Sequence, residues 1–110
     1  MNKKYCKILR TPTFIAAYSE IRVYLKRSSP LAFLALPLAM TTILDTISSN
    51  PRAWPIRRKR IDGMEYEFHV AIIDIAYRQL HIRHFVDSQD IAYLSAAWID
   101  GNDEPGYVLP

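Results

Sequence analysis

The sequence is poor in cysteine and glycine. It has one cysteine, Cys6, and three glycines among 110 residues. A single cysteine excludes an intramolecular disulfide and a cysteine-based zinc site, and so few glycines leave no glycine-rich phosphate loop. A chain of this length has room for one domain, residues 1–110, around one core. These limits exclude a disulfide-stabilised secreted module, a zinc finger and a two-domain enzyme.

A long hydrophobic run is also missing. The most apolar stretch, Pro30 to Leu44, has about 15 residues, fewer than the roughly 20 that a membrane-spanning helix needs. No apolar segment directly follows the N-terminal lysines Lys3 and Lys4, so no signal peptide is indicated. The sequence therefore predicts a buried helix at Pro30 to Leu44, no membrane partner and a cytoplasmic location.

Acidic residues are scarce in the first half of the chain. Residues 1–60 hold twelve of the 14 Lys and Arg residues but only Glu20 and Asp45 among the 11 acids, which gives a formal charge of +10. Residues 61–110 hold Arg78 and Arg83 against nine acids, which gives −7. This asymmetry favours a polyanionic or strongly polarised partner. The alternative is that the two halves pair with each other.

Two helices are predicted between residues 11 and 50. Thr11-Pro12 is typical of a helix start, and Phe14, Tyr18, Ile21 and Leu25 then fall on one helical face. Ser29-Pro30 repeats the start signal, and Asn50-Pro51 ends the second helix near Ser49. The short connection predicts an antiparallel hairpin, with a kink or a break near Pro37.

The rest of the chain has the alternation of β-strands. A short strand is expected at residues 5–10, and three more follow the Asp62-Gly63 turn, with turn residues at 87–90. The basic run at residues 57–60 could add a further short strand. The predicted fold class is α+β, in the order β-α-α-β-β-β, with the helix hairpin packed on a small antiparallel sheet and a loose acidic tail at residues 100–110.

This order, with these residues, resembles the RelE/ParE superfamily of toxins from type II toxin–antitoxin systems. The resemblance runs from about residue 12 to residue 105. It is carried by Asn-Pro-Arg-Ala-Trp-Pro after the helices, by Ile61-Asp62-Gly63 before an aromatic strand, and by Ala76-Tyr77-Arg78-Gln79-Leu80 and Asp90-Ile91-Ala92-Tyr93-Leu94. The Asp-Gly and Tyr-Arg pairs look most like the phage-derived HigB-like branch.

The resemblance implies a growth-inhibiting toxin held by a cognate antitoxin, with ribosome-bound mRNA as its substrate. Related ribonucleases usually carry basic residues or tyrosine on and beyond the last strand. Here the matching stretch, Ser95 to Glu104, has no base and three acids. A catalytic arginine on the second strand, where the family has one, would fall near His69. The resemblance therefore supports the fold and the genetic role more strongly than RNA cleavage.

Four residues form the candidate catalytic set. They lie on two predicted strands, around Phe68 and around Ile82. If the even-numbered apolar residues of these strands pack on the helices, the odd-numbered residues of both strands face solvent on the same side. Histidine, glutamate and arginine can supply the base, the acid and the phosphate-binding cation of a ribonuclease without a metal or another cofactor. The alternative is that the histidines lie on a solvated face without a function. The set is Glu67, His69, His81 and Arg83.

Basic residues form the candidate binding surface for a nucleic acid or an antitoxin. In an extended run, Arg58 and Arg60 share one face and Arg57 and Lys59 share the other. Guanidinium groups bind phosphates bidentately, but a charged run also protects an exposed edge strand from aggregation. The candidate binding residues are Lys26, Arg27, Arg57, Arg58, Lys59 and Arg60.

Three functions stay open on the sequence alone. The first is a RelE/ParE-like toxin that cleaves mRNA, and the second is a ParE-like toxin that inhibits DNA gyrase without a nuclease site. The third is a phage-type adaptor protein whose apolar second helix is an interaction surface. The sequence leaves the oligomeric state open, including a homo-oligomer.

Overall fold

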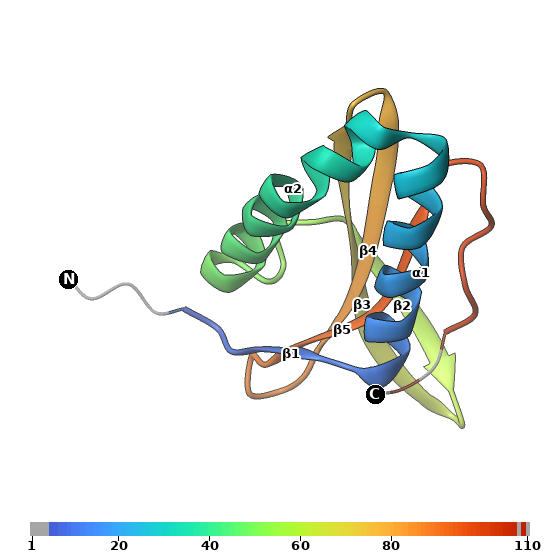
Figure 1. Cartoon of the computed structure of the whole chain (residues 1–110). Coiled ribbons are helices and arrows are strands. Elements are labelled where there is room, and N and C mark those ends of the chain that lie inside the picture. The colour runs from blue at the N-terminus through green and yellow to red at the C-terminus, as the bar shows by residue number, and fades with distance from the viewer. Residues whose placement is uncertain (1–4, 108, 110) are drawn as a thin grey trace.

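The computed structural model describes residues 5–107 and 109, and it has two layers (Figure 1). A hairpin of two helices covers one face of a five-stranded sheet. The predicted α+β class, with a helix hairpin packed on a sheet, is confirmed. The elements are β1 (Ile8–Arg10), α1 (Pro12–Ser28), α2 (Pro30–Ser49), β2 (Ile56–Ile61), β3 (Met64–Ile75), β4 (Arg78–Val86) and β5 (Ala92–Ile99).

The sheet is mixed, with the strand order β1-β5-β4-β3-β2. Strands β2 to β5 pair with one another in antiparallel fashion, as predicted for residues 56–99, and the basic run is part of the edge strand β2. The prediction of a wholly antiparallel sheet is wrong at one edge, where β1 runs parallel to β5 through Ile8 to Arg10. The helices carry the chain from β1 to the opposite edge at β2, and the strands then follow one another back across the sheet until β5 lies beside β1.

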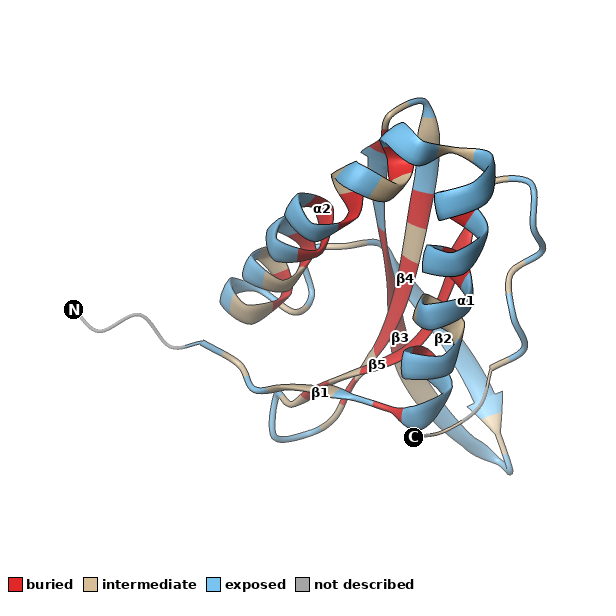
Figure 2. Ribbon diagram, viewed as in Figure 1, coloured by how far each residue is buried: buried red, intermediate tan, exposed pale blue. Residues whose placement is uncertain are grey.

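The start of α1 ties the helix layer to the sheet. The Thr11 hydroxyl accepts a hydrogen bond from the amide of Phe14 at 3.2 Å, which confirms the predicted N-cap. The same hydroxyl donates to the carbonyl of Leu94 on β5 at 2.8 Å. From this anchor, Phe14, Ile21 and Leu25 face the sheet and are buried (Figure 2).

Helix α2 continues through Pro37 without a break. At 20 residues and a mean hydropathy of 1.7, it is long and apolar enough to cross a membrane by length and composition alone. It packs instead on β3 and α1, with Leu36, Ile43 and Ile47 in the core. The Cα radius of gyration, 14.1 Å, is close to the roughly 13 Å of a compact chain of this length. Helix α2 thus buries one side against β3 and α1, whereas Leu31, Leu34 and Leu38 on its other side are exposed.

The turn between β3 and β4 determines which side chains face the helices. Ala76 and Tyr77 have positive φ angles of 48° and 72°, so the strands are joined by a two-residue turn in which Ile75 pairs with Arg78. Every pair on these strands therefore joins an odd number to an even one. Odd residues of β3, such as Ala71, and even residues of β4, such as Ile82, share the helix-facing side.

The conformation of Tyr77 leads to a stability prediction. Its side chain is almost fully exposed, but its backbone lies in the left-handed region that favours glycine. Replacing Tyr77 with Gly should raise the free energy of unfolding by about 1 kcal/mol, measured by urea denaturation. The control Tyr77→Ala removes the ring but keeps a Cβ, and it should give no gain. Equal stability of both variants would contradict the turn geometry.

Candidate functional site

The four predicted catalytic residues lie on opposite faces of the sheet. Glu67 and His69 follow the odd-numbered series of β3 and face the helix side. His81 and Arg83 follow the odd-numbered series of β4 and face the other side, which we call the outer face. The prediction of one shared face is wrong, because the two-residue turn reverses the parity between the two strands. The structure therefore contains two separate polar clusters.

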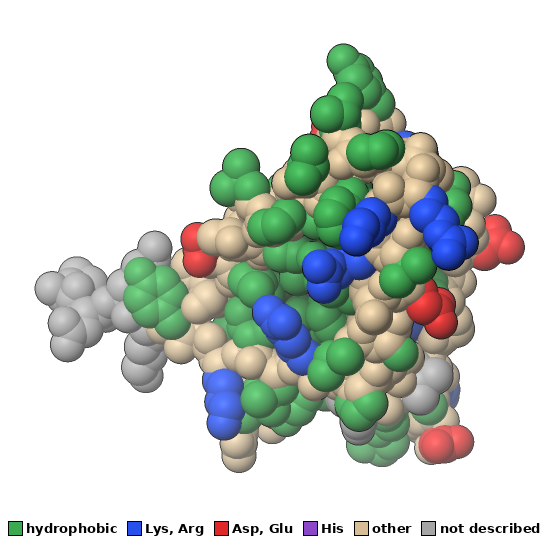
Figure 3. Space-filling model, viewed as in Figure 1, with side chains coloured by type: hydrophobic (Ala, Val, Ile, Leu, Met, Phe, Trp, Pro, Cys, Tyr) green, Lys and Arg blue, Asp and Glu red, His purple; other side chains and the backbone are tan. Residues whose placement is uncertain are grey.

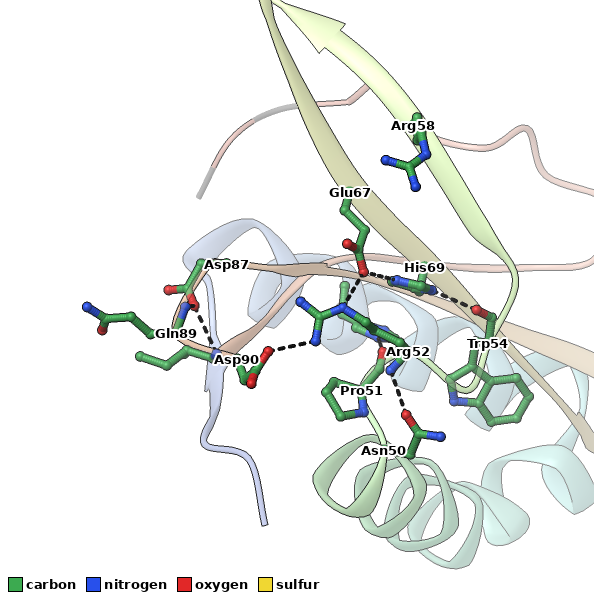
Figure 4. A network of polar contacts seen from close by, with 12 residues as sticks. Asn50, Pro51, Arg52, Trp54, Arg58, Glu67, His69, Asp87, Gln89 and Asp90 are labelled. Atoms are coloured by element: carbon green, nitrogen blue, oxygen red, sulfur yellow. Dashed lines mark hydrogen bonds and ion pairs between the residues drawn. The ribbon is translucent and has the colours of Figure 1, made fainter. Parts of the chain in front are cut away.

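The helix-side cluster consists of Arg52, Glu67, His69, His84 and Asp90, and it connects the loop after α2 to β3 (Figure 4). The ring of His69 contacts the Trp54 carbonyl oxygen through Nδ1 and a Glu67 carboxylate oxygen through Nε2, both at 2.6 Å. Arg52 contacts the same carboxylate oxygen at 2.9 Å and the Asp90 carboxylate at 2.6 Å. Burial raises the pKa of Glu67, but the His69 hydrogen bond and the Arg52 charge outweigh it and lower the pKa overall.

Two buried histidines form the inner part of this cluster. The rings of His69 and His84 stack with centroids 5.4 Å apart, and their exposures are 2% and 0%. His84 donates from Nε2 to the Pro51 carbonyl at 2.7 Å, and burial lowers its pKa to about 4. A substrate cannot reach either ring. We therefore assign a structural role to Glu67, His69 and His84.

The outer face holds a buried arginine under the C-terminal segment. Arg83 is 1% exposed, and it donates from Nη1 to the Pro105 carbonyl at 2.7 Å and from Nη2 to the Gly106 carbonyl at 2.8 Å. The ring of Tyr107 covers the guanidinium at 3.8 Å. Burial lowers the pKa of Arg83, but a guanidinium stays charged in proteins. Arg83 is therefore a buried cation whose hydrogen-bond acceptors are the carbonyl oxygens of Pro105 and Gly106.

Glu104 brings further charges to this face. Its carboxylate accepts from Arg57 Nη1 at 2.8 and 2.9 Å, lies 3.6 Å from Arg83 Nη1, and accepts from the Tyr107 hydroxyl at 2.9 Å. Lys59 Nζ lies 4.9 Å from the centre of the Tyr107 ring. Residues 104–107 were predicted to be loose, but they make these specific contacts across the outer face. Sequence reasoning missed them because the partners are up to 47 residues away and no local pattern links them.

His81 lies beside this cluster on β4. Its ring stacks on Trp98 at 5.1 Å with an interplanar angle of 4°. Burial lowers the pKa of His81, so the ring is neutral near pH 7 and able to accept a proton. Its Nδ1 atom is buried without a hydrogen-bond partner among the residues that the structure describes. The Nδ1 atom of His84 is likewise buried without a partner among these residues, so a ligand reaches Nδ1 of His81 only after the residues that cover it move.

The predicted basic surface is distributed over three places. Arg57 pairs with Phe68 and Lys59 pairs with Tyr66, so the two share one face, as the alternation predicted, and this face is the outer one. Arg58 and Arg60 face the helix side, where Arg58 lies 3.5 Å from Glu65. Lys26 and Arg27 are exposed in the last turn of α1. Only Arg57 and Lys59 of this set join the cluster around Arg83.

Within residues 5–107 and 109, no group of three or more His, Cys, Asp or Glu side chains is placed to hold a metal ion. Comparisons with known proteins give no match: no family model and no curated protein matches the sequence, and no solved structure matches the fold.

The buried state of His84 leads to a pH prediction. The folded protein keeps His84 neutral down to about pH 4, whereas the unfolded chain takes up a proton below about pH 6.5. Stability should therefore fall as the pH is lowered from 6.5 to 4, by roughly 3 kcal/mol, and this contribution should change no further below pH 4. Above pH 6.5 the ring is neutral in both states and contributes no pH dependence.

Urea denaturation at a series of pH values measures this effect. The variant His84→Gln keeps a hydrogen-bond donor without a titrating ring, and it should lose this part of the pH dependence. Identical pH profiles for the wild type and His84→Gln would contradict the assignment.

Proposed function

We propose that the protein is the toxin of a type II toxin–antitoxin module and that it acts on RNA through the outer face of its sheet. The observation that carries this proposal is the gathering of Arg57, Lys59 and Arg83 on the side that also presents His81. RNA cleavage needs cations that bind the phosphate, and it needs a general base, which a neutral imidazole can supply. The element order and the resemblance to RelE/ParE toxins support the class.

The cluster suits cleavage by the 2′-hydroxyl of the RNA itself. His81 takes the proton of this hydroxyl as its oxygen attacks the neighbouring phosphorus. Arg57 and Arg83 stabilise the negative charge that develops on the phosphate oxygens. The 5′ oxygen leaves and takes a proton from Lys59, so the products are a 2′,3′-cyclic phosphate and a 5′-hydroxyl. Glu67 and His69, on the other face, have no part in this reaction.

A ParE-like toxin that inhibits DNA gyrase without a nuclease site is the second candidate. It is favoured by the burial of Arg83 and by the absence of a basic residue from Ser95 to Glu104. In this case the same outer face would bind a macromolecular target without reaction.

The helix side offers a surface for the antitoxin. Leu31, Leu34 and Leu38 are 67–74% exposed on α2, and Figure 3 shows Lys and Arg side chains among hydrophobic ones on this side of the molecule. Lys26 and Arg27 are exposed at the end of α1. This combination suits an acidic amphipathic segment, which would bind leucines with its apolar face and cations with its polar one. Toxin and antitoxin would meet in the cytoplasm, where translation takes place.

The proposed reaction is tested by inducible expression with mapping of RNA 5′ ends. Wild-type protein should arrest growth and produce cleaved mRNA. His81→Ala should reduce cleavage about 10²-fold because it lacks the base. The matched control is Glu67→Gln. Glu67 was also predicted to be catalytic, but it lies on the helix side, so this variant should cleave like the wild type.

Two outcomes would contradict this proposal. Full cleavage by His81→Ala would remove His81 from the reaction. Growth arrest with DNA breaks and intact mRNA would support the gyrase-inhibiting alternative instead.

Antitoxin binding should depend strongly on salt. The antitoxin would be the small protein encoded beside this one, and the complex is measured by titration from 50 to 500 mM NaCl. If Lys26 and Arg27 make the contact on the helix side, affinity should fall steeply over this range, and Lys26→Ala with Arg27→Ala should reduce the slope. Salt-independent binding would show that burial of the leucines alone holds the complex.

A further inference from the structure

We propose that the C-terminal strap, residues 101–107, is an internal competitor that occupies the RNA-binding site of the outer face. Its Glu104 carboxylate lies where an RNA phosphate would bind, between Arg57 and Arg83. The identity of the ligand rests on the proposed function, whereas the occupation of the site rests on the contacts of the strap. The consequence is autoinhibition, because RNA has to displace the strap before it reaches Arg83.

The strap contacts Arg57 and Arg83 as a nucleotide would, and it leaves Nε of Arg83 without a partner among the described residues. The two Nη atoms of Arg83 donate to two successive carbonyl oxygens, in the forked arrangement that guanidinium groups use for two phosphate oxygens. One Nη atom of Arg57 is shared by both oxygens of the Glu104 carboxylate. The ring of Tyr107 stacks on the Arg83 guanidinium, as an unpaired base does on arginine in single-stranded RNA complexes. The strap thus supplies both the anionic and the aromatic part of such a ligand.

Few other contacts hold the strap in place. Its backbone pairs with no strand, and its first amide contact is a turn from Asn102 to the Ile99 carbonyl at 3.2 Å. A hollow of about 520 Å³, lined in part by Tyr24, Trp98 and Asp103, separates the start of the strap from α1 and the end of β5. Gly101 to Asp103, Pro105 and Gly106 are exposed. The segment, dark red in Figure 1, is therefore held by the two Arg83 hydrogen bonds to Pro105 and Gly106, by the ion pairs of Glu104 and by the ring of Tyr107, which also packs on Phe68 at 4.9 Å.

Arg83 cannot be left without partners once the strap moves. A buried guanidinium that loses its acceptors costs several times more free energy than the pair contributes, so the strap leaves only in exchange for another anion or for water. A phosphate with its neighbouring base replaces the carboxylate, the carbonyl oxygens and the phenol ring together. This makes single-stranded RNA a better competitor than a simple anion.

Two adjacent acids provide a matched pair of variants for the test. Glu104→Gln and Asp103→Asn each remove one negative charge from the strap, but Asp103 is exposed and takes part in none of the ion pairs between described residues. The affinity for a single-stranded RNA oligonucleotide is measured by fluorescence anisotropy at constant ionic strength. Glu104→Gln should bind about tenfold more tightly than the wild type, and Asp103→Asn should stay within about twofold.

Tyr107→Ala is a second variant that acts at the other contact. It removes the ring from Arg83 without changing the charge, and it should also tighten RNA binding. If the wild type, Glu104→Gln and Tyr107→Ala bind RNA equally, the strap does not compete and the proposal is wrong, while the RNA-binding function stands. If polyglutamate binds Glu104→Gln more tightly than the RNA does, the site is built for an acidic protein segment and RNA is the wrong ligand.

Backbone dynamics test the strap independently of RNA. The ¹⁵N heteronuclear NOE of the Gly106 amide should be high in the wild type and in Asp103→Asn, and low in Glu104→Gln. A low value in the wild type, or a high value in Glu104→Gln, would overturn the proposal whatever the RNA result. Failure of every variant to bind RNA, with the expected NOE values, would refute the proposed function and leave the strap as a lid over an anion site.

Discussion

The pairing of β3 with β4 is the constraint on which the rest of the structure depends. The two-residue turn at Ala76 and Tyr77 sets a register in which His69 lies opposite His84, and Val70 lies opposite Arg83. This register divides the polar residues of the two central strands between the faces of the sheet. A register shifted by one residue would bury Arg83 under the helices and expose Leu80 and Ile82 to solvent. Hydrophobic burial on the helix side therefore also determines what the outer face presents.

The division of charge along the sequence is partly resolved within the fold. Arg52, Arg57 and Arg58 of the basic half form ion pairs with Glu67, Glu104 and Glu65 of the acidic half. The alternative that the halves pair with each other is thus correct for these residues. These exposed pairs contribute little to stability, about 1 kcal/mol or less each. Their importance on the outer face is that they hold cations beside Arg83 until another anion takes the place of Glu104.

The sequence predicted what local chemistry determines. Thr11 as N-cap, the helix hairpin ending near Ser49, and the Asp62-Gly63 turn all follow from short-range preferences and agree with the structure. The pairing of β1 with β5 and the position of residues 104–107 depend on long-range contacts, so they could not be predicted. The prediction that the four candidate catalytic residues share one face was wrong, since only His81 and Arg83 lie on the outer face. Its error came from the turn, because Ala76-Tyr77 is not a typical sequence for two successive positive φ angles.

Photochemical crosslinking of a 4-thiouridine-substituted, single-stranded RNA to the full chain, with the modified residues identified by mass spectrometry, tests most directly that the outer face binds RNA. Trp98 pairs with His81, and Phe85 pairs with Phe68 and Tyr93, so these aromatic side chains share the outer face. The account predicts adducts at Trp98, Tyr93 and Phe85, and more of them in Glu104→Gln than in the wild type. Adducts confined to aromatic residues of the helix layer, at Tyr18, Tyr24 and Phe33, would contradict it.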